Sequence, residues 1–335
     1  MSNIVFTELE GWEEKYLEDN LSGHKLTFIR RPLQSQDFDG IKRCEILSPF
    51  IYTPVSAEVL EQVSELKLVA TRSTGFDHID IKTCQVKDIT VCNVPFYGEN
   101  TVAEHTWALI LSLSRKIIPS YERTKRGDFS LDNLRGFDLK NKALGVIGAG
   151  HIGQQVIKIA KAFDMKVLVF DPKPNEELVK SLDFNYVSLD ALLKEADVIT
   201  LHAPYNEKTH HLLNAENMTL IKRGTILVNT ARGGLIDTMA LVKALESGIL
   251  AGAGLDVLEE EYAIKEESEL LSPEFKKKCD LKTVIADHVL LKRDNVIITP
   301  HNAFNSQEAI LRILDTTVEN IRGFLDGKVI NQIKV

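Results

Sequence analysis

Residues 143–171 read ALGVIGAGHIGQQVIKIAKAFDMKVLVFD. The apolar run at 143–147 predicts a buried strand, the residues after it have a helical pattern as far as Phe163, and KVLVF predicts a second strand. The turn between the first strand and the helix, GAGHIG, has the glycine spacing of a dinucleotide-binding fingerprint. Gly148 allows the tight turn, Gly150 lets the backbone approach a pyrophosphate, and Gly153 allows close packing of helix on strand. The start of the helix then offers free N–H groups to phosphates.

Asp171 ends the second strand, 23 positions after Gly148. The fingerprint has an acid at this distance, which hydrogen-bonds the adenosine ribose hydroxyls. A carboxylate there also repels the additional phosphate of NADP, so NAD is the predicted cofactor. The alternative is an ordinary glycine-rich turn followed by a solvated aspartate.

Short β-branched runs and longer helical patterns alternate along the whole chain, which predicts the α/β class with parallel sheets. Strands of a smaller sheet are expected at 3–7, 25–29, 45–47, 68–71 and 90–92, with a helix at 57–65 among them. Strands of a larger sheet are expected from residues 143, 166, 185, 197, 225, 252 and 296. The prediction is two doubly wound parallel-sheet domains.

The domain boundaries follow from two helical segments. Thr101–Ile118 is apolar around most of its circumference and is predicted to lie buried between domains or subunits. The helical pattern of Ser306–Leu325 leaves no strand to extend the larger sheet, so this segment is expected to return to the first domain. Residues 1–100 with 301–335 then form one discontinuous domain, and residues 101–300 form the other. The Glu- and Lys-rich stretch Tyr262–Arg293, including His288, is interpreted as a surface excursion.

Composition excludes several classes of function. The 335 residues carry 40 basic and 48 acidic side chains, a net charge of −8, so neither nucleic acid nor an anionic membrane is an expected partner. No apolar run reaches the length of a membrane span, and the first residues lack the pattern of a secretory signal, so the cytoplasm is the expected location. The cysteines lack metal-ligand spacing and are interpreted as buried thiols: Cys44, Cys84, Cys92 and Cys279.

Three predicted strand ends of the larger sheet carry chemically useful side chains. NTARGG places Arg232 at one strand end, GLDVLEEE places Asp256 and Glu261 at the next, and TPHNAF places His301 at the last. Ligands of open α/β sheets bind outside these carboxyl ends. An arginine can hold a carboxylate bidentately, and a histidine beside a carboxylate can transfer protons near neutral pH. The alternatives are a surface arginine, a solvated acid in the Glu run and a structural histidine.

Further motifs occur in a fixed order: RSTGFDHID at 72–80, YGENTVAEH at 97–105, LHAPYNEKTHHLLN at 201–214, NTARGGLIDTMALVKAL at 229–245 and PHNAF at 300–304. Together with the glycine turn, they make nearly the whole chain resemble the D-isomer-specific 2-hydroxyacid dehydrogenase family, in its D-lactate dehydrogenase-like branch. The resemblance implies a flavodoxin-like substrate domain and a Rossmann NAD-binding domain. It also implies reversible hydride transfer between NADH and a 2-keto acid, with pyruvate and D-lactate the favoured pair.

The resemblance implies roles for individual residues. Arg232 would bind and orient the substrate carboxylate, His301 would be the acid and base, and Glu261 would pair with His301. Further substrate contacts would come from backbone N–H groups and from aromatic walls, at Ser73, Thr74 and Gly75, and at Tyr52, Tyr97 and Phe304. Cofactor contacts, besides the three glycines and Asp171, would come from Thr101, Val102, His151, Ile152, Pro204, Thr209, Thr230 and Ala231, with Asp256 in a supporting place or on the nicotinamide side.

The chain departs from the family pattern in two places. It has Tyr262 where the family often has proline after the catalytic glutamate, and the excursion at 262–293 is long. Rival functions on the same fold are a phosphite or formate dehydrogenase and an NADH-sensing scaffold. Glu261 argues against a formate enzyme, in which glutamine pairs with the histidine, and the full set of Arg232, Glu261 and His301 argues against a scaffold. The apolar helix at 101–118 predicts a homodimer.

Overall fold

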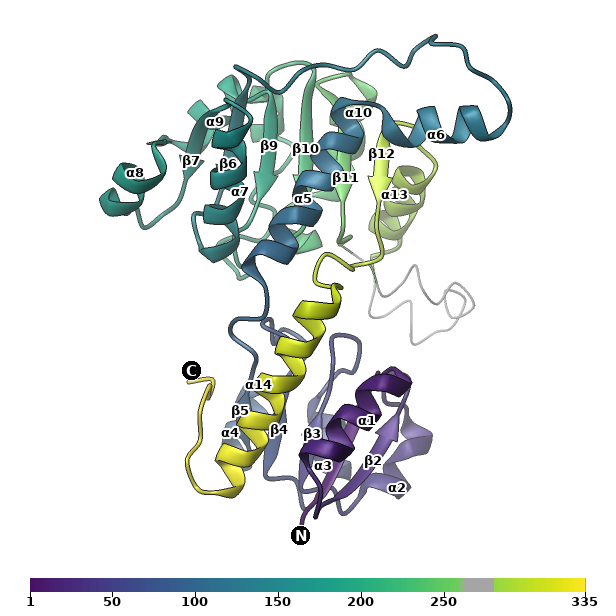
Figure 1. Ribbon diagram of the computed structural model, residues 1–335, viewed down its shortest axis with the longest axis vertical. Coiled ribbons are helices and arrows are strands. Elements are labelled where there is room, and N and C mark those ends of the chain that lie inside the picture. The colour runs from purple at the N-terminus through teal and green to yellow at the C-terminus, as the bar shows by residue number, and fades with distance from the viewer. Residues whose placement is uncertain (260, 262–279, 335) are drawn as a thin grey trace. The chain divides into compact units, whose positions relative to one another are not determined.

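The computed structural model describes residues 1–259, 261 and 280–334. The chain divides into two compact units (Figure 1). Unit 1 consists of Met1–Gly98 and Asn305–Val335, and unit 2 of Glu99–Phe304.

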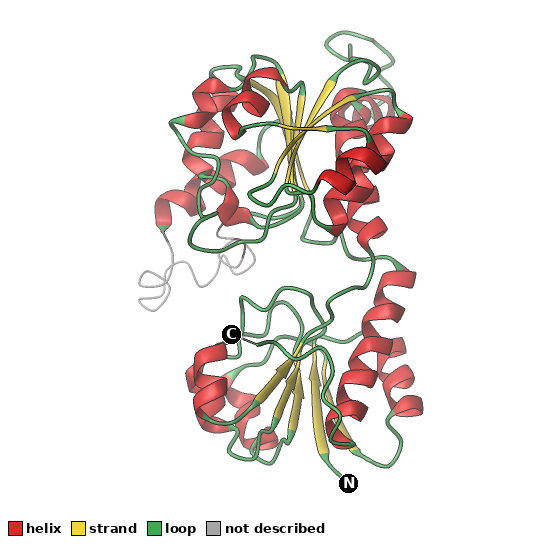
Figure 2. Ribbon diagram, turned by 90° about the vertical axis from the view of Figure 1, so that its left-hand side faces the viewer, coloured by secondary structure: helices red, strands yellow, loops and turns green. Residues whose placement is uncertain are grey.

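Unit 1 is built on a parallel sheet in the order β2-β1-β3-β4-β5. Helices cover both faces of this sheet (Figure 2). Alternate residues of β1 point to opposite faces, so Ile4 and Phe6 pack with α1 and α14, whereas Val5 packs with α3 and α4. The strands are β1 Asn3–Thr7, β2 Lys25–Ile29, β3 Ile46–Ser48, β4 Leu68–Ala70 and β5 Thr90–Cys92, and the helices are α1 Gly11–Asn20, η1 Ser35–Asp37, α2 Phe38–Ile41, α3 Ala57–Gln62, α4 Ile81–Val86 and α14 Gln307–Leu325.

Unit 2 is built on a parallel sheet in the order β12-β11-β10-β9-β6-β7-β8, again with helices on both faces (Figure 2). The strands are β6 Ala143–Ile147, β7 Lys166–Phe170, β8 Asn185–Tyr186, β9 Val198–Leu201, β10 Thr225–Asn229, β11 Leu250–Leu255 and β12 Val296–Ile298. The helices are α5 Glu99–Ser114, α6 Ile117–Lys125, α7 His151–Ala162, α8 Glu176–Leu182, α9 Leu189–Glu195, η2 Asn217–Leu220, η3 Gly233–Leu235, α10 Thr238–Glu246 and α13 Leu281–Leu291. The prediction of two doubly wound parallel sheets is confirmed.

Strand order fixes where each sheet can accept a ligand. In unit 1 the order reverses between β1 and β3, and in unit 2 it reverses between β6 and β9. At such a reversal the loops leave the sheet in opposite directions, which opens a crevice at the carboxyl ends of the strands. The loops that follow these strands are therefore the places to look for a site.

The apolar segment predicted as one helix at 101–118 is two helices. Lys116 has a φ of 55°, in the left-handed region, and it separates α5 from α6. Helix α5 buries Trp107 and Ile110 against its own unit, where it packs on α7, β10 and β11. The sequence predicts that this segment lies buried between domains or subunits, whereas α5 is buried within its own unit, Ile117 and Ile118 are exposed, and α6 projects beyond the sheet (Figure 1).

The interpretation of 262–293 as a surface excursion is wrong for its last part, while Tyr262 and residues 263–279 lie outside the described residues. Asp280 caps helix α13, accepting a hydrogen bond from the N–H of Lys282. Ala286 and Leu290 on this helix are buried in the core, where α13 packs against α10. His288 is half-buried, and its Nδ1 lies 2.9 Å from the carbonyl oxygen of Val284. The sequence signal for helix α13 was the helical spacing of apolar residues inside the Lys- and Glu-rich stretch.

The three described cysteines are buried, as predicted; Cys279 lies outside the described residues. Burial raises the pKa of Cys44 to about 12 and the pKa values of Cys84 and Cys92 to about 11, so all three remain protonated thiols. Within the described part of the chain, no group of His, Cys, Asp and Glu side chains is arranged to hold a metal ion. No helix in this part of the chain has the length and apolar character to cross a membrane.

Candidate active site

The glycine turn after β6 has the geometry of a phosphate cradle. Gly148 has a φ of 99°, a conformation that L side chains rarely adopt, and a Cβ on it would lie 2.7 Å from the carbonyl oxygen of His202. A Cβ on Gly153 would lie 2.1 Å from the carbonyl oxygen of Gly148, so helix α7 approaches the turn as closely as a glycine allows. Around Gly150 there is open space, with no atom within 4 Å of an added Cβ. A pyrophosphate therefore has room at the start of α7.

Asp171 follows β7 and faces this turn. Its Oδ2 accepts a hydrogen bond from the N–H of Ala149 at 2.9 Å, and its Oδ1 accepts one from the N–H of Lys173 at 2.8 Å. The carboxylate is thus held beside the glycine turn by two backbone donors. Each of its oxygens has a second lone pair with which to accept a ribose hydroxyl.

Three neighbouring strands of the larger sheet bring the catalytic candidates to one edge. Arg232 follows β10, Asp256 and Glu261 follow β11, and His301 follows β12, and these strands are adjacent in the order β12-β11-β10. The carboxyl ends of parallel neighbours lie at the same edge of a sheet. Arg232, Glu261 and His301 come from neighbouring strands, so they are brought to the same edge of the sheet in the order in which they occur in the sequence.

His301 and Glu261 form the contact that the sequence predicts. Nδ1 of His301 lies 3.1 Å from Oε2 of Glu261, and both side chains are half-buried. A carboxylate at this distance fixes the ring through Nδ1, which leaves Nε2 for a second partner. His301 also has a φ of 53°, a conformation that non-glycine residues adopt rarely and often at functional sites.

Asp256 supports the turn that carries His301. Its side chain is buried, and it accepts hydrogen bonds from Thr299 Oγ1 and from the N–H groups of Asn302 and Ala303, at 2.5, 3.0 and 2.8 Å. Nε2 of His105 lies 3.4 Å from the same carboxylate and 3.0 Å from the hydroxyl of Thr299. Burial alone would raise the pKa of Asp256, but these hydrogen bonds outweigh it and hold the pKa below its ordinary value. The structure therefore gives Asp256 the supporting place, since its oxygens are engaged by the chain itself.

The turn that carries Arg232 is fixed by the preceding strand and by the loop after β11. Oδ1 of the buried Asn229 accepts from the N–H of Ala231, and its Nδ2 donates to the carbonyl oxygen of Arg232. Gly233 lies so close to the 258–259 backbone that an added Cβ would be 2.1 Å from Leu258. The Arg232 turn and the segment leading to Glu261 are thus in direct contact.

Sequence reasoning left out an ion pair that braces the same region. Oε1 of Glu259 lies 2.5 Å from Nε2 of His211, and its Oε2 accepts from the hydroxyl and the N–H of Thr238 at the start of α10. The pair ties the loop at 205–214 to the residues just before Glu261. His211 and Glu259 lie in the motifs quoted above, as do Asn229 and His105. The motifs do not show the structural role of these residues, which depends on the residues that surround them in the fold. Thr299 was not singled out either.

Unit 1 presents its candidates at the carboxyl ends of β3, β4 and β5. Tyr52 follows β3, Ser73, Thr74 and Gly75 follow β4, and Tyr97 follows β5. The hydroxyl of Ser73 donates to the carbonyl oxygen of Gly75, and that of Thr74 donates to Val94, so both side chains shape the turn. Among the described residues, the three successive N–H groups of Ser73, Thr74 and Gly75 have no hydrogen-bond partner. Such a run of free N–H groups suits an anion.

The remaining cofactor candidates lie in unit 2. Thr101 and Val102 are buried in the first turn of α5, and the hydroxyl of Thr230 lies 2.8 Å from that of Thr106. The hydroxyl of Thr209 donates to the carbonyl oxygen of Pro204 and so closes the loop between them. Nδ1 of His151 lies 3.0 Å from Oε1 of Glu99. Ile152, Ala231 and Phe304 are each half-buried.

Comparison with known proteins gives these sites a family. The family described as D-isomer specific 2-hydroxyacid dehydrogenase, NAD binding domain, matches residues 107–303. The D-lactate dehydrogenase of Escherichia coli is 34% identical over 95% of both chains, and the glyoxylate reductase of Korarchaeum cryptofilum is 33% identical over 89% of this chain and 85% of that protein. The crystal structure of a D-lactate dehydrogenase from Aquifex aeolicus, complexed with NAD and lactic acid, is 38% identical, covers 97% of this chain and 96% of that one, and has a TM-score of 0.87.

The fold and the site define an NAD-dependent oxidoreductase. The chain belongs to the D-isomer-specific 2-hydroxyacid dehydrogenase family, and it resembles the D-lactate dehydrogenases within that family. It is therefore an NAD-dependent dehydrogenase that acts on the CH–OH group of D-2-hydroxy acids, with a Rossmann NAD-binding fold in unit 2.

Proposed function

We propose that this protein interconverts pyruvate and D-lactate, and that it reduces related small 2-keto acids with NADH. The observation that carries the catalytic part of this proposal is the contact of His301 with Glu261 at the strand edge that also holds Arg232. The names of the relatives support the substrate, since two of those reported above are D-lactate dehydrogenases. Glyoxylate is the competing substrate, because another of these relatives is a glyoxylate reductase.

The proposal assigns a role to each residue. The bound cofactor supplies or accepts the hydride at the 2-carbon. Arg232 holds the substrate carboxylate and stabilises the negative charge that grows on the 2-oxygen. His301 in its charged form gives a proton to that oxygen during reduction, and in its neutral form takes it back during oxidation. Glu261 orients the ring, and Asp256 holds the turn from which the ring projects.

We assign two further groups of contacts to the ligands. The free N–H groups of Ser73, Thr74 and Gly75 donate hydrogen bonds to the substrate carboxylate, and Tyr52, Tyr97 and Phe304 contact the substrate's side chain. Gly148, Gly150 and Gly153 hold the pyrophosphate of NAD with Ile152 and His151, and Asp171 holds the adenosine ribose. The other contacts with NAD come from Thr101, Val102, Pro204, Thr209, Thr230 and Ala231. In this assignment unit 1 is the substrate domain and unit 2 binds NAD.

The experiment that tests the proposal is a panel of 2-keto acids followed by NADH absorbance. Pyruvate should give the highest kcat/KM, ahead of glyoxylate and of aromatic 2-keto acids. Arg232→Lys should bind NADH normally and lose most of kcat/KM, since a point charge cannot hold a carboxylate bidentately. A near-normal kcat/KM in this variant would remove Arg232 from the site. Binding of NADH without turnover of any acid would favour the sensing scaffold instead.

We also propose that the protein is a homodimer that pairs through α6 and the residues just after it, a surface that includes the end of the apolar segment at 101–118. Large apolar side chains are exposed along α6 and just after it: Ile117, Ile118, Tyr121, Phe129 and Leu131. Monomers rarely expose such a group of apolar residues, and twofold pairing is the commonest way to cover it.

A further inference from the structure

Glu8 has a backbone conformation that costs free energy. It directly follows β1 and has a φ of 59°, in the left-handed region that side chains other than glycine, asparagine and aspartate rarely occupy. Residues held in such conformations are strained and persist only where their surroundings fix them. The contacts of Glu8 therefore need an explanation beyond the packing of the strand.

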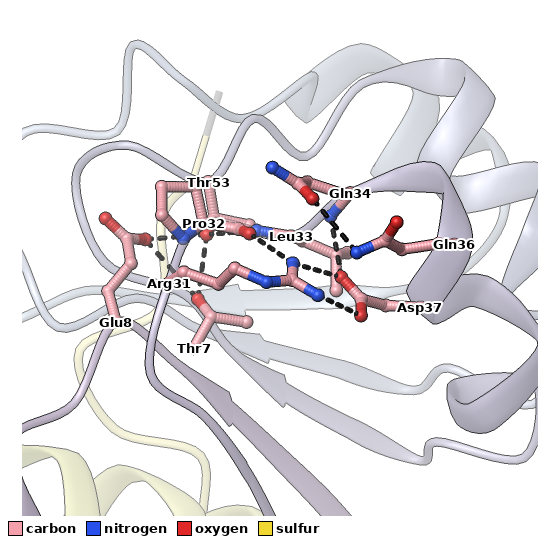
Figure 3. A network of polar contacts seen from close by, with 9 residues as sticks. All are labelled: Thr7, Glu8, Arg31, Pro32, Leu33, Gln34, Gln36, Asp37 and Thr53. Atoms are coloured by element: carbon pink, nitrogen blue, oxygen red, sulfur yellow. Dashed lines mark hydrogen bonds and ion pairs between the residues drawn. The ribbon is translucent and has the colours of Figure 1, made fainter. Parts of the chain in front are cut away.

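The carboxylate of Glu8 gathers the loop that follows β3. Its Oε1 accepts from the N–H of Tyr52 at 2.9 Å, and its Oε2 accepts from the N–H of Phe50 at 3.2 Å and from the hydroxyl of Thr53 at 2.6 Å. Thr53 is fully buried, lies 2.8 Å from the hydroxyl of Thr7, and accepts from the N–H of Leu33 (Figure 3). One side chain thus satisfies three donors of the segment Phe50–Thr53.

The backbone of Glu8 is tied to a second loop through Arg72. This arginine is buried, and its guanidinium donates to the carbonyl oxygens of Thr7 at 2.5 Å, of Glu8 at 3.1 Å and of Ser48 at 3.0 Å. Arg72 directly precedes the turn at 73–75, so the same residue fixes that turn to the end of β1. Its guanidinium also lies 5.4 Å from the centre of the Phe50 ring.

Glu8 occupies the position in unit 1 where a doubly wound sheet accepts its ligand. It follows β1, the loop that it holds follows β3, and the strand order reverses between these two strands. A carboxylate placed there is held by the chain's own donors at both oxygens. It consequently acts on a ligand by shaping the loop beside it.

We propose that Glu8 is a positioning residue that fixes the Phe50–Thr53 loop and thereby sets which side chains of 2-keto acids the protein accepts. The inference rests on the proposed function, in which Tyr52 contacts the substrate's side chain. A carboxylate suits this task because each of its oxygens can only accept, and every group that faces them is a donor. Glutamine of the same size would turn one NH₂ group toward a donor and release part of the loop.

The test compares two substrates in the full-length protein. For wild type and Glu8→Gln, kcat/KM is measured with pyruvate and with phenylpyruvate, an aromatic 2-keto acid. The ratio of the two values should change by about tenfold, as expected when a loop against the substrate shifts by about an ångström. KM for NADH should remain unchanged, because Glu8 lies in unit 1 and every contact assigned to NAD lies in unit 2. A ratio that stays within twofold of wild type, with pyruvate turnover intact, would overturn the inference.

A double-mutant cycle with Tyr52→Ala separates positioning from a general loss of stability. If Glu8 acts through Tyr52, adding Glu8→Gln to Tyr52→Ala should leave the ratio where Tyr52→Ala alone puts it. Equal effects of Glu8→Gln in both backgrounds would overturn the proposal. Thr53→Val, which removes one donor to Glu8 and keeps the shape of the side chain, should move the ratio in the same direction and serves as the second variant if Glu8→Gln fails to fold.

The matched control is Glu45→Gln, the same chemical change on the same unit. Glu45 pairs with the exposed Lys67 at 2.9 Å, and this variant should keep the wild-type ratio. If the ratio in Glu45→Gln changes as much as in Glu8→Gln, the effect belongs to unit 1 as a whole, and the inference is overturned. If wild type reduces no 2-keto acid at all, the proposed function fails instead, and this result is distinct from an unchanged ratio in an active enzyme.

Discussion

At the scale of single residues, the buried carboxylate of Asp256 shows how burial and hydrogen bonding compete. Its side chain belongs to a residue that is only 1% exposed, and desolvation alone would favour the protonated acid. Hydrogen bonds to Asp256 from Thr299, Asn302 and Ala303, with His105 nearby, stabilise the charged form more strongly. These hydrogen bonds stabilise one conformation of the turn at 299–303.

Asp256→Asn should therefore damage both catalysis and stability. The NH₂ group that replaces one oxygen would face either the N–H of Ala303 at Oδ2 or the N–H of Asn302 at Oδ1, at a cost of about 1–3 kcal/mol for an unmatched buried donor. We expect kcat to fall by tenfold or more and the affinity for NADH to change little. Steady-state kinetics and NADH titration measure both.

The same variant has a predicted pH signature. Because the pKa of Asp256 in the folded protein lies below its ordinary value of 3.8, its contribution to stability is full well above that value and is lost as the pH falls through the folded value. The difference in Tm between wild type and Asp256→Asn should thus narrow below about pH 4. The control is Asp197→Asn, whose carboxylate accepts from Ala143 and pairs with Lys222 away from the catalytic turn; it should lower Tm and keep kcat. A normal kcat in Asp256→Asn would contradict the assigned support of His301.

Glu261→Gln keeps the size of the side chain and removes the charge that faces His301 across 3.1 Å. Glutamine can turn either its oxygen or its NH₂ group toward Nδ1, so the ring loses its fixed orientation. We expect kcat/KM to fall in both directions, while the affinity for NADH stays unchanged. Steady-state kinetics in both directions and NADH titration measure this, and a normal kcat/KM would mean that another group orients His301.

At the scale of elements, the turn from β6 into α7 separates the needs of the fold from those of the ligand. Gly148 and Gly153 are required by the chain itself, since an added Cβ would meet backbone atoms that cannot move independently. Gly150 has a φ of −66° and open space around it, so the fold does not require a glycine there. The proposed contact with the pyrophosphate of NAD would account for glycine at this position.

Two alanine variants test this distinction. Gly153→Ala should lower Tm strongly, because its Cβ would lie 2.1 Å from the carbonyl oxygen of Gly148. Gly150→Ala should keep a wild-type Tm and lose most of its affinity for NADH. Thermal unfolding and NADH fluorescence titration distinguish the two, and Gly40→Ala, at another open glycine, is the control for both measurements. Unchanged NADH binding in Gly150→Ala would place the pyrophosphate elsewhere.

At the scale of the whole molecule, the exposed apolar surface of α6 predicts self-association. Tyr121 is 61% exposed and Leu131 is 83% exposed, although both are large apolar residues in a chain of net charge −8. Tyr121→Glu combined with Leu131→Glu should convert a dimer into a monomer at micromolar concentration, as measured by light scattering. Val86→Glu changes a singly exposed valine in unit 1 and should leave the mass of the assembly unchanged. A monomeric wild type would contradict the proposal.

The sequence by itself determined the local elements and the order of the site. Strand and helix boundaries were predictable because apolar periodicity and glycine positions are local properties of the chain, and the stretch at 143–171 has both. The row of Arg232, Glu261 and His301 was also predictable, since the carboxyl ends of parallel neighbours must share an edge. The helix break at Lys116 was not, because Ile117 and Ile118 resume the apolar pattern just after it and the positive φ of Lys116 has no local signal.

Only the tertiary structure decided which residues hold the site in place. Glu8 and Arg72, or Glu259 and His211, are far apart in sequence, and their side chains resemble many solvated or surface charges when considered alone. Helix α13, in a stretch rich in Lys and Glu, is a similar case. Its apolar face is buried because it packs against α10, and only the fold brings these two helices together. The physical reason is that buried hydrogen bonds and ion pairs depend on distance and desolvation, and the fold sets both between residues that the sequence keeps apart.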